Sequence, residues 1–218
     1  MKVFPLQFNE GWTALKDGFS LFFFQAAVSL YTSFNVVYLG LFCSLSQVAS
    51  YAGAERLIKA GLGFYGQISM ALFPRTNSIG SYDQAGMNKM RKKSLIIMGT
   101  LGVLGGMVVL LVAPWVPQLF FKKKLEGIEG ILNILAFVVP AISISNVLGY
   151  QYMLADRSEK EFNKVIVSAA VANLLIGSFL IRRFGPSGMA LTWVVIEWLI
   201  TITLSIIIYS KNRSAYVR

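Results

Sequence analysis

The chain has 218 residues, 56% of them hydrophobic and 14% charged, and its mean hydropathy is +0.63. A soluble fold of this size needs more polar surface, so the composition excludes an ordinary soluble globular domain. The net charge of +10 does not indicate nucleic-acid binding, because the lysines and arginines stand between hydrophobic runs and leave no separate basic domain.

The residues available for chemistry are few. Cys43 is the only cysteine and the chain has no histidine. This excludes an intrachain disulfide, a zinc site and any mechanism that depends on histidine. We therefore expect no metal, no cofactor and no enzymatic activity, and we interpret Cys43 as a packing residue.

The N-terminal segment, residues 1–17, has the pattern of an amphipathic helix. Trp12, Leu15 and Phe19 recur at helical spacing, with charged side chains beside them. Such a segment is typical of a helix that lies in the membrane interface, ahead of the first crossing.

Long uncharged runs follow, and they predict an all-α membrane protein with a bundle of six transmembrane helices, since about 20 apolar residues cross the hydrocarbon layer. The bundle takes residues 18–210, and residues 211–218 form a basic tail. The crossings are expected at Gly18–Cys43, Tyr51–Pro74, Ser94–Phe121, Gly130–Ala155, Val165–Ile181 and Pro186–Ser210. We expect a tight turn at Ser44–Ser50 and the longest loop at Arg75–Lys93.

Lysine and arginine divide unevenly between the two sides of this arrangement. Thirteen fall on the side that holds both termini and seven fall on the other. Cytoplasmic loops have the excess of basic residues, so both termini are expected in the cytoplasm.

The second predicted crossing contains three charged residues, Glu55, Arg56 and Lys59. Each would cost about 2.5–3.5 kcal/mol if it faced lipid at the bilayer centre. They either line a polar cavity or extend from the mouth of the helix to the lipid head groups. Glu55 and Lys59 are four residues apart and can pair, which would leave Arg56 available to an anionic ligand.

Other polar residues in the predicted crossings are Asn35, Gln67 and Glu197. Asn35 and Gln67 could line a cavity or form hydrogen bonds between helices. Glu197 could bind a proton or cation, or it could pair with a basic residue of another helix. We interpret the aromatic residues near span ends, Trp193 and Trp198 among them, as interface residues.

Two features predict how the helices pack. Gly102 and Gly106 form a small-xxx-small pair that lets a neighbouring helix approach closely. Pro140 lies inside the fourth crossing, where it removes a backbone donor and should kink the helix.

Three segments resemble a known family of transporters. Tyr51-Ala-Gly-Ala-Glu-Arg-Leu-Ile-Lys59, with Gln67 and Ala71-Leu-Phe-Pro-Arg75 after it, is similar to the segment after the seventh span of Wzx-type polysaccharide flippases. Leu30–Leu41 resembles their preceding span, and Gly185–Ala190 with Glu197 resembles the entry to their last common span. This resemblance implies one lobe, the C-terminal half, of a two-lobed MATE-like transporter of the MOP exporter superfamily.

The resemblance also implies a function. It is the translocation of an undecaprenyl-diphosphate-linked oligosaccharide, such as an O-antigen repeat unit, across a bacterial inner membrane by alternating access. Arg56 and Lys59 would hold the diphosphate, with Glu55, Gln67 and Asn35 nearby, and Glu197 would couple an ion. The partners would be the lipid-linked oligosaccharide, membrane lipids and a second lobe or another copy of the chain.

Several alternatives stay open. The chain could be an ion-coupled multidrug or metabolite exporter of the same superfamily, although the basic second crossing argues against that. It could be an inactive, truncated half-transporter, because Met1 and the amphipathic segment resemble an internal start in a longer reading frame. A membrane enzyme is disfavoured, since the predicted loop Arg75–Lys93 offers only Asp83 as an acid.

Overall fold

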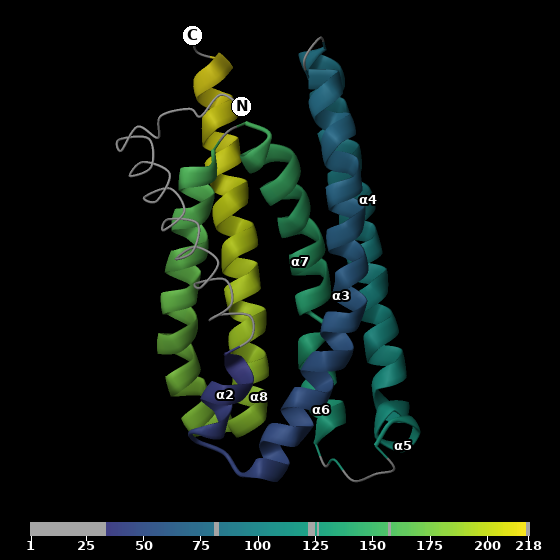
Figure 1. Ribbon diagram of the computed structural model, residues 1–218, viewed down its shortest axis with the longest axis vertical. Coiled ribbons are helices and arrows are strands. Elements are labelled where there is room, and N and C mark those ends of the chain that lie inside the picture. Colours follow the sequence, from purple (N-terminus) through teal and green to yellow (C-terminus); the bar gives the residue numbers. More distant parts are fainter. Residues whose placement is uncertain (1–33, 81–82, 122–124, 126, 157, 217–218) are drawn as a thin grey trace, which may run out of the picture.

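The computed structural model describes residues 34–80, 83–121, 125, 127–156 and 158–216. Every regular element in this part of the chain is a helix (Figure 1). The predicted interfacial segment 1–17 and most of the predicted first crossing lie outside it. The elements are α2 (Asn35–Gly40), α3 (Leu45–Gly80), α4 (Gln84–Val112), the 3-10 turn η1 (Ala113–Trp115), α5 (Val116–Leu119), α6 (Ile128–Leu135), α7 (Val138–Val147), the π-helical segment η2 (Leu148–Leu154) and α8 (Glu159–Tyr216).

The helix α8 is a hairpin of two antiparallel arms, residues 159–184 and 186–216, which lie side by side in Figure 1. The chain reverses at Gly185, whose φ of 56° is strained for any residue with a side chain. Pro186 then starts the second arm, where its fixed φ and missing N–H suit a helix start. Gly188 lies directly against the carbonyl of Leu180, so the arms are close at the turn.

Three of the described helical stretches are long and apolar enough to cross a membrane: Gln84–Leu119, Ile128–Leu154 and Glu159–Lys211. The third contains the two arms of α8. Large apolar side chains on the outside remain exposed, for example Ile96 at 70% and Leu111 at 74%, which suits a surface in contact with lipid. The predicted crossing Tyr51–Pro74 is not among the three, so the count of six stays a prediction.

Several helix ends differ from the prediction. The turn before α3 lies at residues 41–44 and not at the predicted Ser44–Ser50, because Ser44 and Gln47 form a capping box that starts the helix at Leu45. Pro74 lies inside α3, which continues to Gly80. Asp83 then caps α4 by accepting a hydrogen bond of 2.9 Å from the Gly86 amide. The predicted long loop Arg75–Lys93 is therefore wrong: it is almost entirely helical.

The close packing of α4 against α7 confirms the predicted role of the glycine pair. A Cβ on Gly102 would lie 2.8 Å from the Pro140 Cα, and one on Gly106 would lie 2.8 Å from the Ala136 carbonyl oxygen. Pro140 cannot donate to that carbonyl, and the helix breaks between α6 and α7, as predicted. The indole of Trp198 donates to the nearby Phe137 carbonyl at 3.1 Å.

Candidate functional site

The charged residues of α3 lie a few turns into the helix, and the structure separates their roles. Lys59 Nζ is 2.6 Å from the Glu55 carboxylate, whose side chain is 4% exposed, so the predicted pairing is confirmed. Arg56 is exposed on the next face. The ion pairs found among the described residues are Lys59–Glu55, Arg91–Asp156 and Lys211–Glu161, and none uses Arg56.

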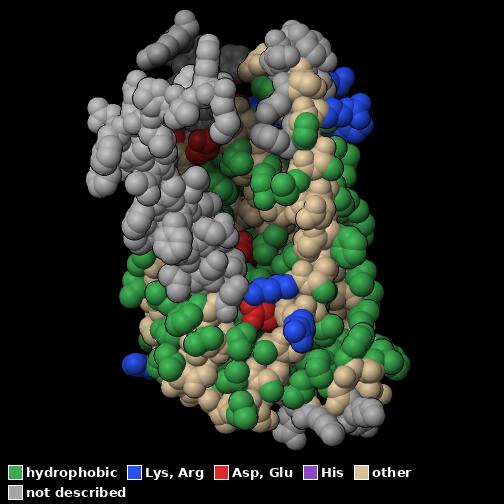
Figure 2. All heavy atoms as spheres, viewed as in Figure 1, with side chains coloured by type: hydrophobic (Ala, Val, Ile, Leu, Met, Phe, Trp, Pro, Cys, Tyr) green, Lys and Arg blue, Asp and Glu red, His purple; other side chains and the backbone are tan. Residues whose placement is uncertain are grey.

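A hollow of about 700 Å³ opens beside these charges. Figure 2 shows acidic and basic side chains together in the lower half of one face, within a mostly hydrophobic surface. The hollow is lined by Val36, Ala52, Gly53, Glu55, Arg56, Leu57, Lys59, Phe120 and Phe121. It therefore combines two cationic groups, one of them paired with Glu55, with apolar walls, a combination suited to an amphiphile with an anionic head.

The second arm of α8 extends the polar group into the bundle. The Lys59 Nζ lies 5.7 Å from the centre of the Trp193 ring. On its other side, the Trp193 indole N–H donates to a Glu197 carboxylate oxygen at 3.2 Å. Trp193 and Glu197 are 2% and 3% exposed. The interface role predicted for Trp193 is wrong, since this tryptophan belongs to the core.

Asn35 lies near this group on α2 and is buried. Its side-chain oxygen accepts a hydrogen bond of 3.2 Å from Asn173 on the first arm of α8, and the buried Tyr51 hydroxyl of α3 faces the Asn35 side chain. Asn35 is therefore a contact between helices, as one of its two predicted roles required.

Gln67 does not join the group. It is exposed on α3 and lies eight residues beyond Lys59, about 12 Å along the helix axis at 1.5 Å per residue. The structure thus brings together Glu55, Lys59 and, through Trp193, Glu197, with Arg56 at the edge.

Two residues of this group were not predicted, Trp193 and Asn173. Trp193 and Glu197 have the same spacing of four residues as Glu55 and Lys59, so their contact follows from one helix face. Asn173 is 138 residues from Asn35, and no local pattern signals that pairing. No three His, Cys, Asp or Glu side chains meet as a metal site within the described residues.

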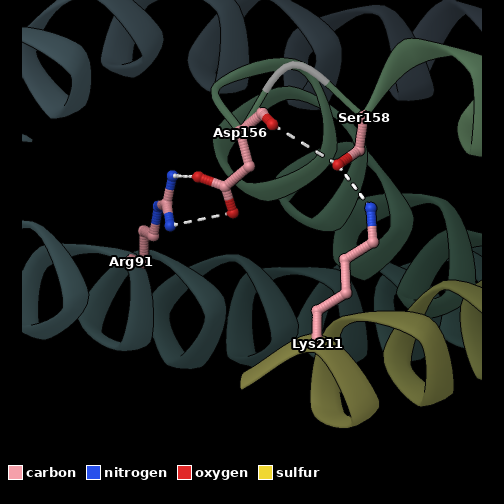
Figure 3. A network of polar contacts seen from close by, with 4 residues as sticks. All are labelled: Arg91, Asp156, Ser158 and Lys211. Carbon is pink, nitrogen blue, oxygen red and sulfur yellow. Dashed lines mark hydrogen bonds and ion pairs between the residues drawn. The ribbon is translucent and has the colours of Figure 1, made fainter. Parts of the chain in front are cut away.

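A second polar network, drawn in Figure 3, lies where α4 begins and α8 ends, at the opposite end of the bundle (Figure 1). Arg91 of α4 is buried and binds both oxygens of Asp156, at 2.6 and 3.4 Å. Lys211 at the end of α8 donates to Ser158 at 2.7 Å and to Glu161 at 3.0 Å. This end unites the start of α4, the turn after η2 and the last turns of α8.

One family model matches part of the chain. Residues 12–80, which include α2, α3 and the charged group Glu55–Lys59, match the family model described as "Polysaccharide biosynthesis protein". This match supports the resemblance to Wzx-type polysaccharide flippases that the sequence predicts.

Two curated proteins similar to the chain are both named "Putative O-antigen transporter". The one from Escherichia coli strain K12 is 28% identical over 217 residues, which cover 94% of this chain and 52% of the relative. The one from Shigella dysenteriae is 28% identical over 190 residues, which cover 87% of this chain and 47% of the relative. The chain thus spans about half the length of these relatives, and no solved structure matches it.

Proposed function

We propose that this chain is part of a flippase that moves an undecaprenyl-diphosphate-linked oligosaccharide across a bacterial inner membrane. The observation that carries the proposal is the hollow on α3, where Arg56 and Lys59 lie beside apolar walls. A diphosphate head needs cationic groups that are shielded from lipid. The prenyl tail needs no polar partner and can stay in the bilayer. The names of the two relatives point to the same class of cargo.

The proposed mechanism is alternating access. The head group enters the hollow from the cytoplasmic side, the helices rearrange, and the head group leaves on the periplasmic side while no bond is made or broken. A site of this kind lies between two lobes in transporters built from repeats, so the proposal includes a second lobe or a second copy of this chain. It also places both termini in the cytoplasm.

Complementation tests this function. The chain is expressed alone, and together with the first lobe of a related flippase, in a bacterium that lacks its own O-antigen flippase, and surface glycan is measured. Rescue by the chain alone means that it works as an oligomer with itself. Rescue only with the added lobe makes it a half-transporter. The absence of rescue in both strains contradicts the proposal and favours the inactive remnant.

In a rescued strain, the double substitution R56Q/K59Q should lower export by about tenfold or more, because hydrogen bonds to a charged ligand are worth about 1.5–3 kcal/mol each. R182Q/R183Q is the matched control. It also removes two positive charges, but from exposed positions just before the turn of α8, and it should leave export unchanged. Equal export by both double variants would contradict the assigned site.

A second candidate function is an ion-coupled exporter of small molecules, and the buried carboxylate of Glu197 favours it. Under that function E197Q should abolish export of a drug or metabolite from cells, while R56Q/K59Q should have little effect. The single variant E197Q and the double variant R56Q/K59Q together therefore distinguish the two functions.

A further inference from the structure

Trp193 occupies a position between two charged groups on different helices. One part of its indole faces a cation, with the Lys59 Nζ 5.7 Å from the ring centre. Its N–H donates to the Glu197 carboxylate at 3.2 Å. Lys59 is held on its other side by Glu55 at 2.6 Å. A continuous series of contacts thus joins Glu197, deep in the bundle, to the edge of the hollow.

These contacts depend on one another for a physical reason. A hydrogen bond from the indole N–H to an ionised carboxylate is charge-assisted and about twice as strong as one to a neutral acid. It fixes the ring and leaves its face more electron-rich, which strengthens the attraction of a nearby ammonium. When the acid is neutral, both effects weaken and the ammonium is held less firmly.

The surroundings of Glu197 offer no competing charged partner among the described residues. The helix α7 has no titratable side chain, and within the described part Trp193 is the side chain found to interact with the Glu197 carboxyl. Several titratable groups on the packed elements have contacts elsewhere: Tyr38 with the Leu174 carbonyl, Tyr51 with the Asn35 side chain, Tyr65 with the Leu101 carbonyl, Tyr152 with Arg91, and Glu55 with Lys59. Arg56, Glu129 and Tyr150 are not among the groups that interact with the Glu197 carboxyl within the described part.

We propose that Trp193 is a positioning residue that links the ionisation of Glu197 to the availability of Lys59. With Glu197 ionised, the indole holds Lys59 toward the bundle. Protonation of Glu197 loosens the indole and frees the ammonium to bind an anionic head group in the hollow. This inference rests on the proposed function, and it supplies the route by which a proton taken up at Glu197 would load the cargo.

The test is a double-mutant cycle in the full chain, purified into lipid nanodiscs. The dissociation constant of inorganic pyrophosphate is measured by calorimetry from about pH 5 to about pH 8, a range in which a perturbed carboxyl can titrate. At each pH the wild-type chain is compared with E197Q, so the titration of the probe itself cancels. We expect E197Q to bind pyrophosphate about three- to tenfold more tightly than the wild-type chain at the alkaline end of the range, and equally tightly at the acid end.

The background W193F keeps the ring and removes the N–H. There, E197Q and its parent should bind pyrophosphate equally at every pH. The matched background is W198F, whose indole N–H binds the Phe137 carbonyl and no carboxylate; it should keep the wild-type ratio. If E197Q still tightened pyrophosphate binding at the alkaline end in the W193F background, Glu197 would act on the hollow by charge alone. The proposed link would then be overturned.

A second measurement needs no substitution at Trp193. Tryptophan emission of the wild-type chain should change over the same pH range, and this change should be absent in E197Q. Identical emission profiles of the two proteins would also overturn the link. If pyrophosphate fails to bind the wild-type chain, or binds K59Q equally well, the proposed function of the hollow fails and the link fails with it. If pyrophosphate binding depends on Lys59 but the effect of E197Q is the same in the W193F background, the link fails while the proposed function of the hollow stands.

Discussion

Arg91 shows how a single charged residue is accommodated inside this bundle. It is 3% exposed, yet its guanidinium meets both oxygens of Asp156 and lies 4.9 Å from the centre of the Tyr152 ring. A planar guanidinium matches a carboxylate and an aromatic face at the same time, whereas a lysine could not. The pair therefore fixes α4 to the turn after η2.

Removal of the carboxylate should destabilise the fold, because Arg91 would stay buried without a counter-ion. We expect D156N to lower the free energy of unfolding by about 1–3 kcal/mol, less than for a fully buried pair, since the Asp156 side chain is 46% exposed. Denaturant unfolding in detergent micelles measures this. E161Q is the control: both side chains of the Lys211–Glu161 pair are about half exposed, so its effect should be smaller. A larger effect of E161Q would contradict the argument.

For contacts between single residues, the sequence predicts those within one helix and misses those between helices. The Glu55–Lys59 pair follows from a spacing of four residues. Arg91 and Asp156 are 65 residues apart, and the expected loop at Arg75–Lys93 placed Arg91 in solvent. Only the packing of α4 beside η2 could reveal that pair.

The elements meet most closely where α4 crosses α7. The glycines of α4 remove side-chain volume there, and Pro140 cannot donate to the Ala136 carbonyl, which accepts a 3.3 Å hydrogen bond from the Val139 amide instead. Each of these two features, a glycine pair and a proline, is visible in the sequence. Their mutual contact is a property of the fold, since Gly106 approaches the carbonyl that Pro140 cannot satisfy.

We expect G106A to destabilise the protein by about 1–3 kcal/mol, because the new methyl group would overlap the Ala136 carbonyl. G99A on the same helix is the control. Its Cβ would lie 3.7 Å from Ile144, an ordinary contact, and the higher helix propensity of alanine should make it neutral or slightly stabilising. Thermal unfolding followed by circular dichroism measures both, and equal melting temperatures would contradict the close approach.

The ends of the helices could be predicted only where the apolar pattern and the end signal coincide, as at Pro186. Hydropathy ends a crossing at the first charges, but α4 begins at Gln84, ten residues before the predicted Ser94, because Asp83 supplies the cap. Likewise α3 begins at Leu45 through Ser44 and Gln47. These capping residues are present in the sequence and outweigh the charges that follow them.

For the molecule as a whole, the prediction concerns orientation. The described basic residues of the predicted cytoplasmic side gather at one end of the bundle, with Arg91 and Lys211, while Arg182 and Arg183 lie at the turn of α8 at the other end (Figure 1). The single cysteine makes a direct test possible. In a C43S background, R213C should react with a membrane-impermeant maleimide only in inverted vesicles, and R183C should react in intact cells. The reverse pattern would contradict the proposed orientation.

The hairpin of α8 has a consequence for biogenesis. Its arms are joined by a turn at Gly185 in which Gly188 touches Leu180, so little chain is available to let one arm enter the bilayer before the other. With the proposed orientation, Arg182 and Arg183 must cross the hydrocarbon during insertion, at about 2.5–3.5 kcal/mol each near its centre. Leucine, isoleucine, valine and phenylalanine return only about 0.3–0.6 kcal/mol each. When both arms enter together, the insertion free energy of two apolar helices offsets the cost of the two arginines. The translocon would then release α8 as one inserted unit.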